Sequence, residues 1–192
     1  MNLTLFTAPK PFTNPHINLI QRNAIQSWQH LGENVRVILV GDEAGMAETA
    51  AEFGVIHLPQ VQRNQDGTPL VSSIFELARQ HSPDPLLAYL NADILLTPAF
   101  LEPVKQIADQ VKHFLIVGQR WDLDVRQPLD FSPGWDERLL ADMRQRGRLH
   151  PPMGSDYFIF PRQCFVKMPP FAIGRAGWDN WMFTHARMQG WA

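Results

Sequence analysis

Hydrophobic residues form one long run near the middle of the chain, and a short polar segment interrupts it. Residues 86–90 and 94–96 are apolar, and Asn91 and Asp93 lie between them. Prolines near both ends leave the run too short for a buried helix, so it predicts a central strand over 86–96, buried on both faces as parallel strands are. Because residues i and i+2 of a strand point to the same side, we expect Asn91 and Asp93 to project together where the strand ends.

A carboxylate in such a run needs a partner. Burial of an unpaired charge is costly, so Asp93 requires a cation or hydrogen-bond donors. A hard divalent cation often binds through a carboxylate together with substrate phosphates, and open α/β sheets bind ligands at the carboxyl ends of their strands. The pattern favours a ligand site here, although an aspartate that caps a neighbouring loop would give the same sequence.

Before and after this run, strand-like and helix-like patterns alternate up to Gly118. Period-2 or continuous apolar runs predict strands, and apolar residues spaced three and four apart predict helices. The expected strands are 2–7, 35–40, 55–58, 86–96 and 114–118. The expected helices between them are 14–31, 46–53, 70–80 and 98–111. This alternation is typical of a parallel α/β sheet flanked by helices, here a single domain over 1–192.

The pattern changes after Gly118, where prolines and tryptophans become frequent. We expect a charged helix over 135–146, a strand over 156–160 and a last helix over 178–189. The irregular segments between them favour a binding site built from loops.

Composition narrows the class of protein. The chain has 192 residues, 45% of them hydrophobic, and a net charge of −2, so we expect no nucleic-acid partner. No apolar stretch is long enough for a transmembrane segment, and residues 1–11 do not resemble a signal peptide. Cys164 is the only cysteine and excludes an intrachain disulfide, which fits a cytoplasmic location.

Several common catalytic motifs are missing. The sequence contains no GxGxxG or Walker A loop, no His/Cys spacing typical of zinc sites and no GxSxG element. What remains is a set of acidic and amide residues at loop edges, with prolines and aromatic residues. This set suits a sugar nucleotide, whose diphosphate binds a metal ion and whose base and sugar contact aromatic rings.

Five segments, taken in order, resemble the GT-A class of nucleotide-diphospho-sugar glycosyltransferases, in its family-2-like branch. They are Phe6-Thr7-Ala8-Pro9, Val37-Ile38-Leu39-Val40-Gly41-Asp42, Leu90-Asn91-Ala92-Asp93-Ile94-Leu95-Leu96, Asp156-Tyr157-Phe158-Ile159-Phe160, and Ile173-Gly174-Arg175-Ala176-Gly177-Trp178-Asp179-Asn180-Trp181. The resemblance covers nearly the whole chain and implies a GT-A (Rossmann-like) sheet.

The resemblance also assigns a donor site. Asn91-Ala92-Asp93 would be the DXD element, with Asn91 near the ribose and Asp93 holding Mn²⁺ or Mg²⁺ against the diphosphate. Because asparagine adds no charge, we expect weaker metal binding than in the usual motif. An aspartate at position 91 should preserve or strengthen metal binding. The remaining donor-binding residues would be Thr7, Ala8, Pro9, Asp42 and Arg120. Ordinary turn chemistry is the alternative for Thr7 and Asp42, and Arg120 is a candidate because it directly follows the fifth strand.

The acceptor side would come from the last third of the chain. Asp156 and Tyr157 would lie beside the acceptor, although Asp156 could simply cap a turn. Trp178 and Trp181 suit stacking on the apolar faces of a sugar. Asp179 would be the general base that deprotonates the acceptor hydroxyl, and a plain helix N-cap is the alternative.

These expectations combine into a metal-assisted transferase that takes a sugar from a nucleotide-diphosphate donor to an acceptor that the sequence does not identify. A sugar nucleotidyltransferase is the alternative enzyme, although the first loop has no glycine-rich basic stretch for a triphosphate. A catalytically silent nucleotide- or carbohydrate-binding domain is a third reading, favoured by Asn91. The chain is also short for the class, so we expect a minimal or truncated member that lacks a C-terminal strand and tail.

Overall fold

The computed structural model describes residues 1–152 and 154–192, and its elements follow the predicted order, with two short strands, at 121–122 and 148–149, that were not predicted. The strands are β1 (Leu3–Thr7), β2 (Val35–Val40), β3 (Ile56–Leu58), β4 (Leu86–Leu90), β5 (Ile116–Val117), β6 (Trp121–Asp122), β7 (Arg148–Leu149) and β8 (Tyr157–Pro161). The helices are α1 (Pro15–Gln29), α2 (Met46–Phe53), α3 (Val71–His81), the 3₁₀ turn η1 (Pro98–Phe100), α4 (Leu101–Gln110), α5 (Trp135–Arg146) and α6 (Trp178–Met188). Every expected helix is confirmed, with small differences at the ends.

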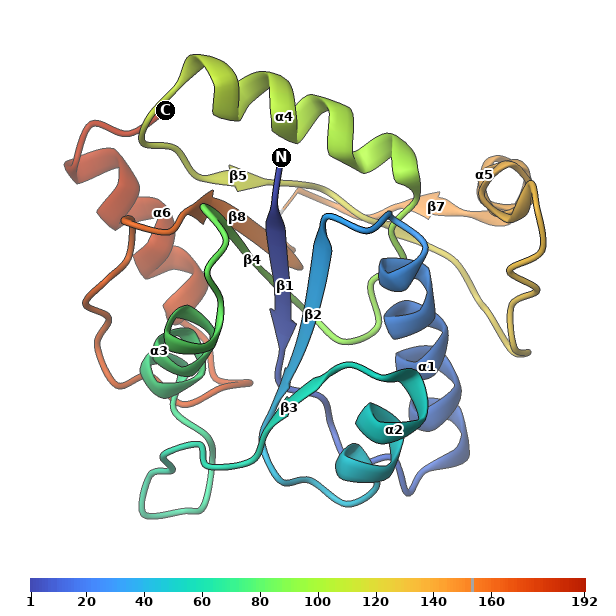
Figure 1. The fold of residues 1–192 in the computed structure, drawn as a ribbon, viewed down its shortest axis with the longest axis horizontal. Helices are drawn as coiled ribbons and strands as arrows, with labels where there is room; N and C mark the ends of the chain where they lie inside the picture. Colours follow the sequence, from blue (N-terminus) through green and yellow to red (C-terminus); the bar gives the residue numbers. More distant parts are fainter. Residues whose placement is uncertain (153) are drawn as a thin grey trace.

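The sheet is mostly parallel, as predicted. Its strand order is β3-β2-β1-β4-β8-β5, and β1 pairs in parallel with both β2 and β4. β8 lies between β4 and β5 and runs antiparallel to both. β8 therefore starts at the edge where β1, β2 and β4 end, which brings its first residues to that edge. A separate two-stranded ribbon, β6-β7, carries α5 at the side of the molecule (Figure 1).

Helices cover both faces of the sheet, because alternate strand residues supply two apolar surfaces. Leu3 and Leu5 of β1 pack in a core with α1, α2 and α4, whereas Phe6 packs on the other face with α3 and α6. Figure 1 shows this layering, with α3 and α6 on one side of the strands and α1 and α2 on the other. The sheet is thus a fixed platform for the loops at its ends.

The central strand is shorter than predicted. β4 ends at Leu90, and residues 91–94 form a turn in which the Ile94 amide donates to the Asn91 carbonyl at 3.2 Å. The strand prediction for 91–96 is therefore wrong. Asn and Asp favour turns because their side chains bond to nearby backbone, and the Trp28 indole, which donates to the Ile94 carbonyl at 2.8 Å, holds the chain in its new direction.

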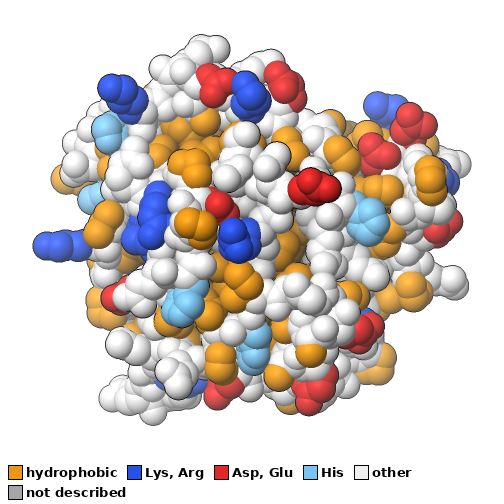
Figure 2. Space-filling view, viewed as in Figure 1, with side chains coloured by type: hydrophobic (Ala, Val, Ile, Leu, Met, Phe, Trp, Pro, Cys, Tyr) orange, Lys and Arg blue, Asp and Glu red, His pale blue; other side chains and the backbone are white. Residues whose placement is uncertain are grey.

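The surface carries charges of both signs. On the face seen in Figure 2, acidic and basic side chains lie among exposed hydrophobic ones, and neither sign covers the face. Within residues 1–152 and 154–192, no helix has the length and apolar character needed to cross a membrane.

Candidate active site

A cleft of about 570 Å³ opens at the carboxyl edge of the parallel strands. It lies where open α/β sheets bind ligands and falls within the size range of small-molecule sites. Its wall includes the loops that follow β1, β2 and β4 and the start of α6. Six of the predicted site residues line it: Ala8, Pro9, Asn91, Asp93, Trp178 and Asp179. The structure thus brings together residues up to 171 positions apart in the chain (179 − 8).

Gln21 of α1 shapes the loop after β1. Its side-chain oxygen accepts from the Lys10 amide at 2.7 Å, and its nitrogen donates to the Lys10 carbonyl at 2.9 Å. Gln21 is buried and also lines the cleft. Sequence reasoning missed this residue. The available signal was a polar residue placed one position from the buried stripe of an amphipathic helix.

The turn after β4 presents two different polar groups to the cleft. Asn91 is half-buried, and its Nδ2 donates to Asp156 Oδ1 at 2.9 Å. Asp93 is exposed at the cleft wall, and its carboxylate makes no hydrogen bond or ion pair with any residue that the structure describes. The expectation that an aspartate at position 91 would preserve or strengthen metal binding stays a prediction, and the neighbouring Asp156 carboxylate opposes it, because it would meet a second carboxylate.

Tyr89, the residue before the last of β4, also lines the cleft. Its ring packs edge-on against Trp178 at a centroid distance of 5.2 Å. Burial, with a smaller contribution from the Asp93 charge, raises the pKa of the Tyr89 hydroxyl far above its usual value. The group is therefore a neutral hydroxyl at any physiological pH. Sequence reasoning missed it, although a single tyrosine in an otherwise aliphatic strand was a signal.

Trp178 and Asp179 begin α6 at the cleft. The burial of Trp178 and the identity of the N-cap differ from the predictions. Trp178 is buried, with 7% of its surface exposed, so only a small part of the ring is open for sugar stacking. The N-cap of α6 is Gly177, with φ of 116°, so the reading of Asp179 as the N-cap is wrong. Asp179 Oδ1 accepts from the Asn180 amide at 2.8 Å. The positive end of the helix dipole stabilises a carboxylate at this position.

Three of the predicted donor residues, Thr7, Asp42 and Arg120, lie away from the cleft wall. Thr7 is fully buried at the end of β1, and its hydroxyl has no hydrogen-bond partner in the described part of the chain. Asp42 is exposed and forms an ion pair with Arg63, which also donates to Glu43 at 2.9 Å. Of the two acids after β2, Glu43 lines the cleft.

Two of the predicted acceptor residues also point elsewhere. Trp181 stacks on His185, one turn further along α6, at a centroid distance of 4.7 Å. The Tyr157 ring packs against Phe100, and its hydroxyl occupies the place that a Cβ at Gly118 would take. Burial raises the pKa of the Tyr157 hydroxyl as well.

Arg120 and Asp156 meet behind Asn91. Arg120 forms an ion pair with the buried Asp156 carboxylate and donates to Asp122 Oδ1 at 2.8 Å. His150 Nδ1 lies 2.8 Å from Asp122 Oδ2. Bonds from His150 and then Arg120 lower the pKa of Asp122. Arg120 lies outside the cleft wall, and its guanidinium pairs with the carboxylates of Asp122 and Asp156.

The cleft offers a divalent cation one protein carboxylate, so the other ligands of the cation would have to come from a bound substrate. Among the described residues, no three His, Cys, Asp or Glu side chains gather into a metal site. Asp93 offers one uncommitted carboxylate at the cleft. A hard cation bound by one carboxylate needs further oxygens from a ligand such as a diphosphate, so the donor set suits a metal that arrives with its substrate.

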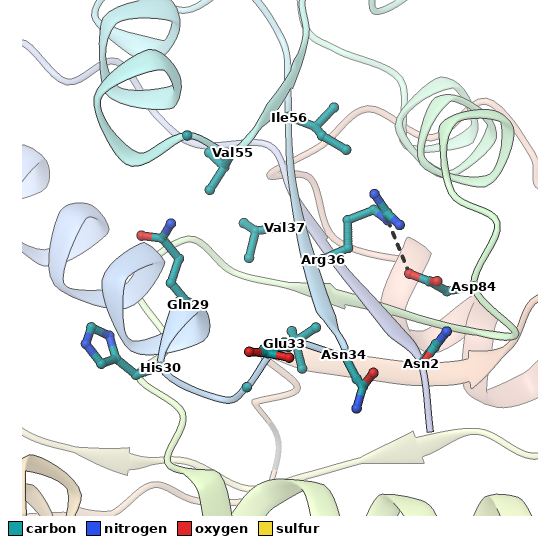
Figure 3. A pocket seen from close by; sticks show the side chains of 13 residues that line it. Asn2, Gln29, His30, Glu33, Asn34, Arg36, Val37, Val55, Ile56 and Asp84 are labelled. Atoms are coloured by element: carbon teal, nitrogen blue, oxygen red, sulfur yellow. Dashed lines mark hydrogen bonds and ion pairs between the residues drawn. The ribbon is translucent and has the colours of Figure 1, made fainter.

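A second hollow, of about 550 Å³, lies at the opposite edge of the sheet (Figure 3). There the buried Asp84 carboxylate accepts from the Thr4 hydroxyl at 2.6 Å and pairs with Arg36 at 3.4 Å. Figure 3 shows Arg36 reaching toward Asp84 across this hollow. Since these charges are satisfied within the protein, the cleft at the carboxyl edge is the better candidate site.

Comparison by sequence is uninformative: no protein-family model matches the chain, and no curated protein matches it. Comparison by structure finds clear likenesses. A protein from Desulfovibrio desulfuricans, assigned as a nucleotide-diphospho-sugar transferase, superposes with a TM-score of 0.56 and 12% identity over 98% of this chain and 77% of that one.

Two further structures are similar. Glucosyl-3-phosphoglycerate synthase from Mycobacterium tuberculosis, solved with Mn²⁺ and uridine diphosphate, gives a TM-score of 0.59 and 12% identity over 98% of this chain and 66% of that one. A 4-diphosphocytidyl-2C-methyl-D-erythritol synthase from Anaerococcus prevotii gives 0.54 and 10% identity over 97% and 82%. The chain therefore has the GT-A-type fold of the nucleotide-diphospho-sugar transferases.

Proposed function

We propose that this chain is a glycosyltransferase that moves a sugar from a nucleotide-diphosphate donor to an acceptor hydroxyl. The observation that carries the proposal is the meeting of Asp93 and Asp179 in one cleft at the carboxyl edge of the sheet, beside the loop after β1. The uncommitted carboxylate of Asp93 suits a metal-bound diphosphate, and the carboxylate of Asp179, of which only Oδ1 has described partners, suits an acceptor hydroxyl. The fold shared with nucleotide-sugar enzymes supports the same assignment.

Donor binding in this proposal uses Ala8, Pro9, Asn91 and Asp93. A Mn²⁺ or Mg²⁺ ion, held by Asp93 and the diphosphate, would neutralise the charge that develops on the leaving nucleotide. The short β1 loop, fixed by Gln21, would flank the base. Thr7 and Asp42 would contribute through the backbone of their loops, because their side chains are buried or paired.

Acceptor binding would occur at the start of α6. Asp179, on the cleft wall, would take the proton from the acceptor hydroxyl as the bond to the sugar forms, and the exposed part of Trp178 would contact the acceptor. Asp156, Tyr157 and Trp181 would act by supporting this wall. We place the reaction in the cytoplasm, because the buried thiol of Cys164 is the only one and the chain depends on no disulfide.

A sugar nucleotidyltransferase is a second candidate, favoured by the similar TM-score of the diphosphocytidyl-methylerythritol synthase. The charges of the cleft oppose it. Lys10 is the only Lys or Arg on the described wall, which also carries Glu43, Asp93 and Asp179. A triphosphate carries more negative charge than a diphosphate and would need more cations than this wall offers.

Calorimetry with uridine and guanosine diphosphates, with and without Mn²⁺, tests the proposal. We expect Mn²⁺-dependent binding that Asp93→Asn weakens by about tenfold or more, since one charged ligand contributes more than 1.4 kcal/mol. Asp66→Asn, at an exposed loop aspartate that is not part of the described cleft wall, is the matched control and should bind normally.

Turnover separates the candidate functions. Release of nucleoside diphosphate from a nucleotide sugar supports a transferase. Exchange of pyrophosphate into a nucleoside triphosphate identifies a nucleotidyltransferase, and binding without turnover identifies a silent domain. Binding that ignores both Mn²⁺ and Asp93 would contradict the proposed metal site.

A further inference from the structure

The buried carboxylate of Asp156 uses both of its oxygens. Oδ1 accepts from Asn91 Nδ2 at 2.9 Å, and Oδ2 pairs with Arg120 Nη1. The backbone adds a third link, since the Asn91 amide donates to the Asp156 carbonyl at 2.8 Å. Asp156 retains 7% of its surface, so this carboxylate lies behind the cleft wall. The three residues join the turn after β4, the start of β8 and the start of β6.

This arrangement fixes the orientation of the Asn91 amide. An ionised carboxylate only accepts hydrogen bonds, so the NH₂ group of Asn91 must face Asp156. The opposite orientation would place the amide oxygen against a carboxylate oxygen. The Asn91 oxygen is therefore directed away from Asp156, and no described residue donates to it. Because Asn91 lies on the cleft wall, its oxygen is open to a ligand hydroxyl.

The same geometry explains why position 91 carries an amide. A carboxylate there would meet Asp156 at hydrogen-bond distance, and two like charges so close cannot both remain ionised without a large cost. Arg120 compensates one carboxylate, but it already pairs with both Asp156 and Asp122. A second carboxylate at this point would leave the network one cation short.

We propose that Asp156 is a positioning residue for the donor, which holds the Asn91 amide so that its oxygen accepts a hydroxyl of the nucleotide sugar, and that it thereby selects asparagine over aspartate at position 91. This inference rests on the proposed function for the identity of the ligand. Arg120 pairs with the other oxygen of the buried Asp156 carboxylate. Asp93 is then the single free carboxylate of the turn.

An exchange of the two side chains tests the proposal. The four proteins are the unaltered chain, Asn91→Asp, Asp156→Asn and the double exchange, which restores one donor and one acceptor with the charge moved to position 91. Melting temperature and calorimetric binding of uridine diphosphate with Mn²⁺ are measured near neutral pH. Asn64→Asp is the matched control, because the described bonds of Asn64 use only its oxygen, which accepts from the Asp66 and Thr68 amides.

We expect Asn91→Asp to lower the melting temperature and to weaken nucleotide binding by about tenfold or more, the effect of one lost charge-assisted bond. The double exchange should recover most of the stability and affinity, whereas Asn64→Asp should change neither.

Additive effects of the two single changes, in melting temperature and in affinity, would overturn the proposal. An unaltered chain that binds no nucleotide would overturn the proposed function and the donor role of Asn91, but the melting temperatures would still report the pairing of Asn91 with Asp156. Coupling in melting temperature without coupling in affinity would reduce Asp156 to a purely structural residue and overturn its positioning role.

Discussion

Gln21 binds both main-chain groups of Lys10, through hydrogen bonds of 2.7 and 2.9 Å. One buried side chain of α1 thus sets the path of the loop that follows β1 and forms one wall of the cleft. A glutamine suits this task because its amide offers a donor and an acceptor in one plane.

Gln21→Met should destabilise the protein by about 1–3 kcal/mol, because it leaves two partly buried backbone groups without partners. Nucleotide binding should weaken as well, since the loop is no longer fixed. Chemical denaturation and calorimetry measure the two effects. Gln26→Met, in the same helix and with no described side-chain hydrogen bond, is the control. Equal stability of the two variants would contradict the role given to Gln21.

Asp179→Asn should lower turnover by about 10²–10⁴, the usual cost of a lost general base, with little change in melting temperature. The variant keeps the oxygen that accepts from the Asn180 amide, so the start of α6 should be preserved. Donor affinity should also persist, because the proposed donor contacts lie on other loops.

The chain supplies a matched control for this variant. Gly134-Trp135-Asp136 starts α5 just as Gly177-Trp178-Asp179 starts α6, each with a glycine N-cap of positive φ. Asp136 is not among the residues of the described cleft wall. Asp136→Asn should leave turnover unchanged. If both variants transfer sugar at the normal rate, Asp179 is not the base.

Both tyrosines of the chain, Tyr89 and Tyr157, should resist ionisation, because burial raises the pKa of each hydroxyl. Tyrosinate absorbance of the folded protein around pH 10 should lie below that of free tyrosine, which is about half ionised at this pH. Unfolding at that pH should release the absorbance at once. Half-ionisation of the folded protein near pH 10 would contradict this prediction.

The raised pKa values of the two tyrosines also make the free energy of unfolding depend on pH. The folded state binds the tyrosine proton more tightly than the unfolded state does, so the stabilisation is complete below the unfolded pKa of about 10. The free energy of unfolding should therefore fall as the pH rises above that value. Tyr157→Phe should make this alkaline loss smaller.

Cys164 should react very slowly in the folded protein. The residue is fully buried, and burial raises the pKa of its thiol to about 11. At neutral pH the reactive thiolate is therefore rare. Since no other cysteine is present, labelling by a thiol reagent reports directly on opening of the core. Rapid labelling under native conditions would show that α6 opens readily, because Cys164 packs in the core beneath that helix.

The sequence by itself determined the alternation of strands and helices and the edge at which polar residues gather. Periodicity carries this information, since each helix or strand must bury one apolar side. It also placed Ala8, Asn91 and Asp93 near one site, because loops that follow parallel strands meet at one edge. Asp179 was placed there by the resemblance to the GT-A class.

Only the tertiary structure decided which side chains reach the cleft. Local pattern does not tell where β8 inserts, and its antiparallel place beside β4 is what pairs Asp156 with Asn91. Trp178 and Asp179 are neighbours in sequence, yet packing against Phe158 and Tyr89 buries the first. The same Gly-Trp-Asp segment starts α5 and α6, and one of the two lies at the cleft. Long-range packing decides which of these side chains reach the cleft. The sequence does not reveal this, because contacts between distant segments leave no periodic pattern in a single sequence.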